Sequence, residues 1–192
     1  MYSTFMELIN PDQQGNWKEL YNEAGLRISG NITNENQFKF EFELDNTPFT
    51  CFELLTNIDK RKSWDELVDE ISLVEKIDSN TGVFYVKTKP VMIVSSRDSV
   101  VLSHKKAMED GALVQVFRSV DHPKFPVTPK FVRATNGVSG VIFIPIPGNP
   151  RKTKVIQISE SNPGGWVPAK VKNSGFFFFF FFFFFFFFFI FF

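Results

Sequence analysis

The sequence predicts an α+β fold in which one curved antiparallel sheet carries few helices. The segment Gln37–Leu44 alternates phenylalanine or leucine with charged residues, the period-2 pattern of a strand with one solvated face. From Leu67 onward, apolar runs follow one another with only short turns between them, and short turns join antiparallel neighbours. Such a sheet is long enough to curl. The clearest helix start is Thr47-Pro48, because threonine can cap a helix and proline is tolerated in its first turn.

Length and composition limit the classes of protein to which this chain can belong. A chain of 192 residues fits one domain with a sizeable core. Lys+Arg 21 balances Asp+Glu 21, so no net field favours a nucleic-acid partner. The single cysteine, Cys51, excludes an internal disulfide and a cysteine-rich zinc site. The first residues lack the basic and apolar regions of a secretory signal, which predicts a cytoplasmic protein.

The C-terminal residues differ in composition from the rest of the chain. Every residue of Phe176–Phe192 is phenylalanine except Ile190. We therefore expect a domain over residues 1–175 and a low-complexity tail over residues 176–192.

The N-terminal half predicts two helices, or three with a short opening one, among the first strands. Apolar spacing and the turn residues between the runs set the boundaries. The expected helices are Met1–Ile9, Pro48–Asn57 and Asp59–Glu66, and the expected strands are Trp17–Tyr21, Leu26–Ile32 and Gln37–Leu44.

The C-terminal half reads almost wholly as strands. The expected strands are Ile71–Ile77, Val83–Lys87, Ser99–Met108, Ala112–Val120, Lys130–Thr135, Gly140–Pro145 and Lys154–Ser159. Three prolines make Asp121–Pro129 a loop, and Asn136-Gly137 predicts a hairpin because it is the strongest short hairpin signal.

Two features of these strands point to function. Phe38, Phe40 and Phe42 share one face and need a large apolar partner, either a packed helix or a ligand. Arg97 and Asp98 place opposite charges side by side after a bend. They form either a structural ion pair that fixes the turn or, through Arg97, a polar contact at the mouth of a ligand cavity.

Catalytic and metal-binding patterns are missing from the sequence. His104 and His122 are the only histidines, and neither has a Cys, Asp or Glu at ligand spacing. We find no nucleophile elbow, P-loop, dinucleotide fingerprint or paired-histidine zinc motif. The sequence thus predicts a protein that is not an enzyme and has no catalytic residues, metal or cofactor.

Several motifs in order nevertheless resemble one family, the START lipid-transfer domains related to the steroidogenic acute regulatory protein. The resemblance covers roughly Trp17 to Asn173. Its motifs are Trp64-Asp65, Arg97-Asp98-Ser99-Val100, Ser119-Val120-Asp121-His122-Pro123, Phe131-Val132-Arg133-Ala134 and Gly164-Gly165-Trp166-Val167-Pro168. The resemblance implies a helix-grip fold, in which a curved antiparallel sheet wraps a long C-terminal helix around a lipid tunnel. It also implies a carrier or sensor of one lipid that contacts membranes transiently and does no chemistry.

The resemblance also suggests which residues bind the lipid. The tunnel is expected to be lined by Phe38, Phe40, Phe42, Phe84 and Val86, with Arg97, Ser99 and Ser103 as further candidates. The charged pair of sterol-binding members falls on Val86 and Ser103, and the aromatic choline cage falls on Val86, Ser99 and about Gly137, so both devices are missing. The phosphate-contacting arginine falls on Arg61. A phospholipid with another headgroup is therefore slightly favoured over a sterol.

The resemblance ends at the expected lid helix. Val167-Pro168 begins it correctly, but Ser174-Gly175 and the phenylalanine run replace its amphipathic stripe. We expect a C-terminally truncated lid whose tail is a gene-model artefact. Two alternatives stay open: a membrane-tethered lipid sensor anchored by the tail, and a helix-grip enzyme acting on a hydrophobic ligand. As a helix the tail would span roughly 26 Å, against a hydrocarbon core of about 30 Å.

Overall fold

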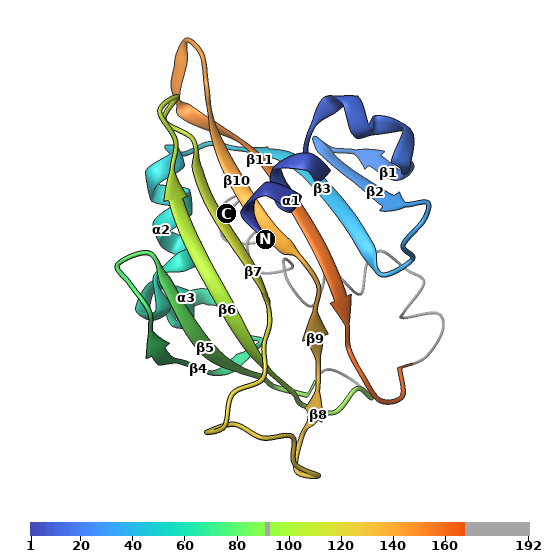
Figure 1. Cartoon of the computed structure of the whole chain (residues 1–192). Coiled ribbons are helices and arrows are strands. Elements are labelled where there is room, and N and C mark those ends of the chain that lie inside the picture. The colour runs from blue at the N-terminus through green and yellow to red at the C-terminus, as the bar shows by residue number, and fades with distance from the viewer. Residues whose placement is uncertain (91–92, 168–192) are drawn as a thin grey trace.

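The computed structural model describes residues 1–90 and 93–167. Figure 1 shows one large curved sheet with helices on both of its faces. The helices are α1 (Tyr2–Leu8), the 3-10 helix η1 (Pro11–Asn16), α2 (Pro48–Thr56) and α3 (Ile58–Trp64). The strands are β1 (Trp17–Glu23), β2 (Leu26–Asn31), β3 (Gln37–Leu44), β4 (Val68–Lys76), β5 (Thr81–Thr88), β6 (Arg97–Ala107), β7 (Leu113–Ser119), β8 (Val132–Arg133), β9 (Thr135–Asn136), β10 (Ser139–Ile146) and β11 (Asn149–Asn162).

The strands form one sheet in the order β1-β2-β3-β11-β10-β7-β6-β5-β4. All neighbours on this path are antiparallel. Short turns join consecutive pairs such as β1–β2, β6–β7 and β10–β11, whereas β3 pairs with β11 and β7 with β10 across longer connections. The crossover from β3 to β4 carries α2 and α3. The expected α+β class and its large antiparallel sheet are therefore confirmed. The expected lid and the tail at residues 176–192 lie outside the described residues.

Helix α1 packs on one face of the sheet. Its Phe5 is completely buried in a cluster with Val114, Val116, Ile142 and Ile158 from β7, β10 and β11. Strand residues at alternate positions point to opposite faces, so the neighbours of these residues point toward α2 and α3 instead. We call that opposite side the α2 face; it holds the cavity described below.

Helix α2 lies over β7, β10 and β11 on the α2 face, beside the part that β3 contributes. Phe38, Phe40 and Phe42 lie in one buried cluster with Phe52 of α2, whose ring meets Phe143 of β10 edge-on at 6.1 Å. Among the described residues, a packed helix is thus part of the apolar partner that the phenylalanine face requires.

Local capping fixes the angle between α2 and α3. The Thr47 side chain accepts a hydrogen bond from the Thr50 N–H at 3.2 Å, as expected for an N-cap. Asn57 ends α2 in an extended conformation and caps α3 by accepting hydrogen bonds from Asp59 and Lys60. The two helices are then held together because the Trp64 indole donates to the Leu54 carbonyl at 2.9 Å. This arrangement directs Arg61 toward the sheet.

The hairpin predicted around Asn136-Gly137 is wrong. Strand β9 pairs with β11, where Asn136 lies opposite Ser161, and β10 pairs with β7 and β11. The Gly137 N–H donates to the Glu160 carbonyl at 2.9 Å, which joins this segment to β11. The chain therefore pairs with β11 here and does not form a tight turn.

The buried cysteine gives a first prediction. Cys51 is fully buried, and burial raises the pKa of its thiol from 9.0 to about 11. At pH 8 this shift lowers the reactive thiolate fraction about a hundredfold. We expect an alkylating reagent to modify the native protein slowly and the urea-unfolded protein rapidly, as measured by mass spectrometry. Equal rates would contradict the burial.

The same shift sets the sign of a pH effect. The folded thiol holds its proton more tightly than the unfolded one. The Cys51 contribution to the free energy of unfolding therefore falls as pH rises from 9.0 to about 11.

Candidate functional site

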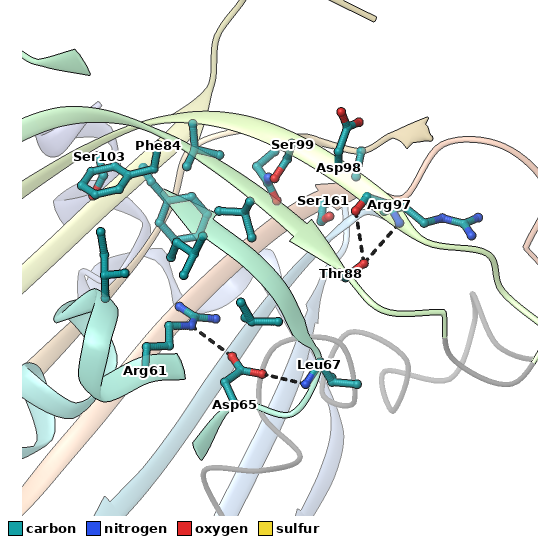
Figure 2. Close-up of a pocket in the computed structure, with 18 of the residues that line it drawn as sticks. Arg61, Asp65, Leu67, Phe84, Thr88, Arg97, Asp98, Ser99, Ser103 and Ser161 are labelled. Carbon is teal, nitrogen blue, oxygen red and sulfur yellow. Dashed lines mark hydrogen bonds and ion pairs between the residues drawn. The ribbon is translucent and has the colours of Figure 1, made fainter. Parts of the chain in front are cut away.

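A cavity of about 130 Å³ lies on the α2 face, between α2, α3 and strands β4 to β7. Figure 2 shows its wall from close by, with side chains from both the helices and the strands. Its middle is apolar, because Phe84 and Val86 of β5, Val101 of β6 and Phe117 of β7 face inward. The strand register brings them together, since Phe84 lies directly opposite Val101.

The cavity wall turns polar on both sides of this apolar middle. At one side Ser103 of β6 accepts a hydrogen bond from the Gln115 side chain of β7 at 2.9 Å. At the other side are Ser99 of β6, Asn136 of β9 and Ser161 of β11. The inward positions of β6 thus read serine, valine, serine.

Arg61 reaches into the cavity from α3. Its Nε donates to the Asp65 carboxylate at 3.0 Å, one helical turn away, and Asp65 also accepts from the Leu67 N–H at 3.2 Å. Asp65 is buried, so the pair shields a carboxylate that would otherwise be costly to bury. The two terminal nitrogens of Arg61 bond to no residue that the structure describes. They remain able to donate to a ligand.

Arg97 holds the end of the described chain against the sheet. It is 2% exposed, and burial lowers the pKa of its guanidinium. Its Nε donates to the Pro163 carbonyl at 3.3 Å, and Nη2 donates to the carbonyls of Gly164 and Trp166, each at 3.4 Å. Its Nη1 donates to the carbonyl and hydroxyl of Ser95. All five donors are therefore in use.

The turn that Arg97 holds requires glycine. Gly164 and Gly165 have φ values of +60° and +58°, in the left-handed region that other residues rarely adopt. A side chain on Gly164 would also meet the Arg133 carbonyl at 2.6 Å.

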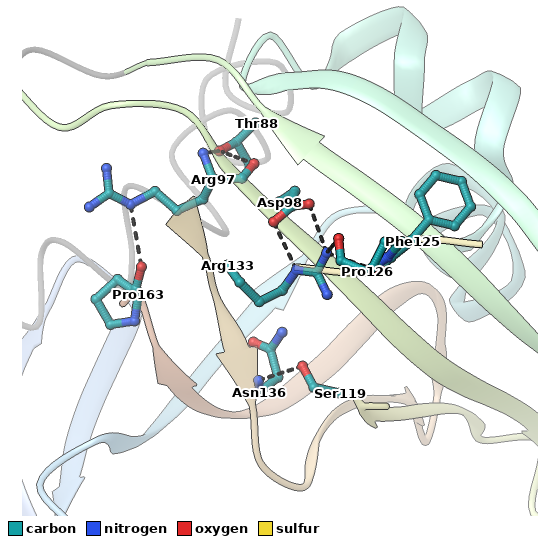
Figure 3. A network of polar contacts seen from close by, with 9 residues as sticks. All are labelled: Thr88, Arg97, Asp98, Ser119, Phe125, Pro126, Arg133, Asn136 and Pro163. Carbon is teal, nitrogen blue, oxygen red and sulfur yellow. Dashed lines mark hydrogen bonds and ion pairs between the residues drawn. The ribbon is translucent and has the colours of Figure 1, made fainter. Parts of the chain in front are cut away.

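Asp98 pairs with Arg133, not with Arg97. Figure 3 shows the bidentate contact, with Arg133 Nε and Nη2 donating to the two Asp98 oxygens at 2.8 and 3.0 Å. The expected ion pair between Arg97 and Asp98 is wrong, because neighbouring residues of β6 point to opposite faces. The contact fixes β8 beside β6 and raises the pKa of Arg133.

Most of the candidate ligand-binding residues line this cavity. They are Arg61, Phe84, Val86, Arg97, Ser99 and Ser103. Phe38, Phe40 and Phe42 are not among the lining residues in the described part of the chain; they lie in the core cluster with Phe52. The expectation that they line the cavity is corrected here, because their rings are buried in the core cluster that also contains Phe52 of α2, Phe143 and Val155. Whether any of these residues binds a ligand stays a prediction.

Several lining residues escaped the sequence analysis. They are Thr56, Asp65, Val101, Gln115, Phe117, Asn136 and Ser161. Val101 lies between Ser99 and Ser103 at the same period of two, so strand alternation predicts that its side chain also points into the cavity. Asn136 was missed because the Asn-Gly pair predicts a turn, whereas the structure places Asn136 in strand β9.

Within residues 1–90 and 93–167, no group of three or more His, Cys, Asp or Glu side chains is placed to hold a metal ion. None of the helices in this part of the chain has the length and apolar character needed to cross a bilayer.

Known proteins share both the sequence pattern and the fold. The START domain family matches residues 8–180. The StAR-related lipid transfer protein 5 of Bos taurus is 30% identical over 174 residues, covering 86% of this chain and 80% of that protein. The mitochondrial steroidogenic acute regulatory protein of Danio rerio is 26% identical over 170 residues, covering 86% and 59%.

The solved structure of human StAR-related lipid transfer protein 5 superposes with a TM-score of 0.80 at 25% identity. The match covers 91% of this chain and 84% of that one.

Proposed function

The chain belongs to the START domain family, and on this premise we propose that it binds one lipid molecule in the cavity on the α2 face and transfers or senses it without chemical change. Two of the relatives described above, the bovine protein and the human protein of the solved structure, carry lipid transfer in their names. In this proposal the protein works in the cytoplasm and contacts membranes only transiently, while it takes up or releases the lipid.

The observation that carries the proposal is the apolar band across the cavity wall. Phe84, Val86, Val101 and Phe117 face inward from three adjacent strands. A lipid chain packed on them leaves water at roughly 0.8 kcal/mol per buried methylene. Few polar contacts are then needed, only enough to orient the headgroup.

The experiment is native mass spectrometry of the purified protein, followed by transfer of labelled lipids between vesicles. We expect one bound lipid per chain, and transfer that rises with protein concentration. A protein that neither retains nor transfers any lipid would overturn the proposal. A ligand released with altered mass would favour the helix-grip enzyme instead.

Arg61 supports the finer proposal that the lipid is a phospholipid. Its terminal nitrogens point into the cavity without a described partner, and a guanidinium can fork onto phosphate oxygens. Asp65 offsets part of its charge, so the contact is weaker than that of a free arginine.

Replacing Arg61 with alanine should weaken phospholipid binding by about 1.5–3 kcal/mol and leave sterol binding less changed. Affinities for both lipid classes would be measured by fluorescence displacement. Lys60→Ala is the matched control, because Lys60 lies on the same helix and its exposed side chain pairs with Glu53. If Arg61→Ala lowers the affinity for phospholipids and sterols equally, Arg61 does not contact the phospholipid headgroup.

A further inference from the structure

Helix α3 presents an exposed serine directly after a run of basic residues. Ser63 follows the run 60–62, which reads Lys-Arg-Lys. Lys60, Lys62 and Ser63 are all exposed. Cationic residues two and three positions before a serine, with a large apolar residue after it, attract protein kinases whose peptide-binding groove is acidic. Trp64 supplies the apolar residue, so this segment has the charge pattern of a kinase substrate.

The fold separates Ser63 from a second hydroxyl with a similar sequence context. Arg151 and Lys152 come directly before Thr153 in β11. Thr153 is completely buried, and its hydroxyl donates to the Asn46 carbonyl at 2.7 Å. A kinase therefore has access to Ser63 and not to Thr153 in the folded protein.

Helix α3 has to open locally before a kinase can read the side chains around Ser63. Arg61 points into the cavity (Figure 2), and the Trp64 indole donates to the Leu54 carbonyl. Among the described α-helices, α3 is the one without a buried residue, whereas α1 buries Phe5 and α2 buries four residues. Segments with few buried apolar contacts open at a small free-energy cost, so α3 is the helix that opens most readily.

We propose that Ser63 is a phosphorylation site for a basic-directed protein kinase, and that the phosphate opens α3 and with it one wall of the cavity. In this step the Ser63 Oγ attacks the γ-phosphorus of a nucleoside triphosphate and forms the new O–P bond. The bond from that phosphorus to the oxygen bridging the β- and γ-phosphates breaks, and the nucleoside diphosphate leaves. The hydroxyl proton passes to the catalytic aspartate of the kinase.

The position of Ser63 makes the phosphate unfavourable for the helix. Ser63 is the next-to-last residue of α3, and a negative group at a helix C-terminus opposes the helix dipole. Asp59 lies one turn earlier and repels the phosphate. The Ser63 hydroxyl also donates to the Lys60 carbonyl at 2.6 Å, and a phosphate ester oxygen has no proton to donate. Lys60 offsets little of the added charge, because its ammonium already pairs with Glu53 at 3.1 Å.

The same helix forms part of the cavity wall. Ile58 and Arg61 line the cavity from α3, and Asp65 and Leu67 line it just after the helix ends. Opening α3 separates Arg61 from Asp65, which its Nε contacts at 3.0 Å. A lipid bound in the cavity should then leave faster, and by linkage a bound lipid should slow the phosphorylation. This consequence rests on the lipid-binding function proposed above, whereas the modification itself does not.

The first experiment treats the full chain with the catalytic subunit of protein kinase A and ATP, and locates the phosphate by mass spectrometry. We expect phosphate on Ser63 and none on Thr153, although synthetic peptides centred on each residue are both modified. The double variant Lys60→Ala/Lys62→Ala should lower the rate at Ser63 about fivefold or more, because it removes two of the three charges that the kinase reads. A native chain that stays unmodified at Ser63 while the peptide is modified would overturn the proposal. An unchanged rate in the double variant would overturn the assignment to a basic-directed kinase.

The second experiment measures the effect of the phosphate on α3. Amide hydrogen exchange in α3 should become about tenfold faster in the phosphorylated chain, and a fluorescent phospholipid should be released to phosphatidylcholine vesicles faster. Ser63→Ala treated with kinase is the control and should match the untreated protein in both measurements. Unchanged exchange in α3 after modification would overturn the opening of the wall. If the protein binds no lipid, the proposed function fails, while hydrogen exchange still decides this inference.

Discussion

Replacing Val101 with tryptophan is expected to abolish lipid binding while the protein stays folded. Val101 lies at the centre of the apolar band, between Ser99 and Ser103 on β6. The added indole would occupy much of a cavity of about 130 Å³. Because the side chain enters existing space rather than packed core, the loss of stability should stay near the low end of the 1–3 kcal/mol typical of overpacking.

The measurements are lipid transfer between vesicles and the thermal unfolding midpoint. Leu20→Trp is the matched control, since it places the same indole on β1, away from the cavity lining, at a side chain that is 50% exposed. We expect that variant to transfer lipid normally. A Val101→Trp protein that is folded and still transfers lipid at the wild-type rate would show that the lipid does not occupy this cavity.

Charged substitution of Phe40 would be a poor test of the same point. Phe40 is 1% exposed inside the core cluster with Phe52, so a charge there should unfold the protein. Val86→Glu is preferable, because Val86 lines the cavity itself.

The sequence predicted the elements whose signals are local. Strand β3 follows from its period of two, and α2 from Thr47 and Pro48, because alternation and capping act within a few residues. The turn preference of Asn136-Gly137 is equally local, but the pairing of this segment with β11 overrides it. A local turn preference is a weak signal, and the hydrogen bonds and packing of a sheet ladder override it.

Only part of the candidate site could be predicted from the sequence. The alternation of apolar and charged residues predicts which side chains share a face of the sheet, but it does not predict what covers that face. Phe38, Phe40 and Phe42 were therefore assigned to the ligand cavity, although they lie in the core cluster. Family resemblance supplied Arg61, Val86 and Ser103, which the cavity does contain. Asn136 and Ser161 meet only through long-range pairing of β9 with β11. No pattern in one segment reveals such a contact.

The Asp98–Arg133 pair is the polar contact whose loss should destabilise the fold most. Asp98 is 6% exposed and receives two hydrogen bonds from Arg133, at 2.8 and 3.0 Å. Arg133 also donates to the Phe125 carbonyl at 3.1 Å, which ties the proline-rich loop to the sheet. Both side chains are largely shielded from water, so solvent screens the attraction weakly.

Arg133→Ala should therefore lower the free energy of unfolding by about 3–5 kcal/mol, because it leaves the Asp98 carboxylate buried without a counter-charge. Urea denaturation measures the change. Arg27→Ala is the control: Arg27 pairs with Glu19 at 3.4 Å, but both side chains are about half exposed, and surface pairs contribute about 0–1 kcal/mol.

The double variant Arg133→Met/Asp98→Asn separates charge burial from packing. Removing both charges should recover part of the stability, since no unpaired carboxylate is left. We also expect Arg133→Ala to weaken lipid binding, because the pair anchors the segment that carries Asn136 beside β6. If Arg133→Ala costs no more than Arg27→Ala, the buried pair does not hold β8 in place, and the polar end of the cavity must be positioned by β11 alone.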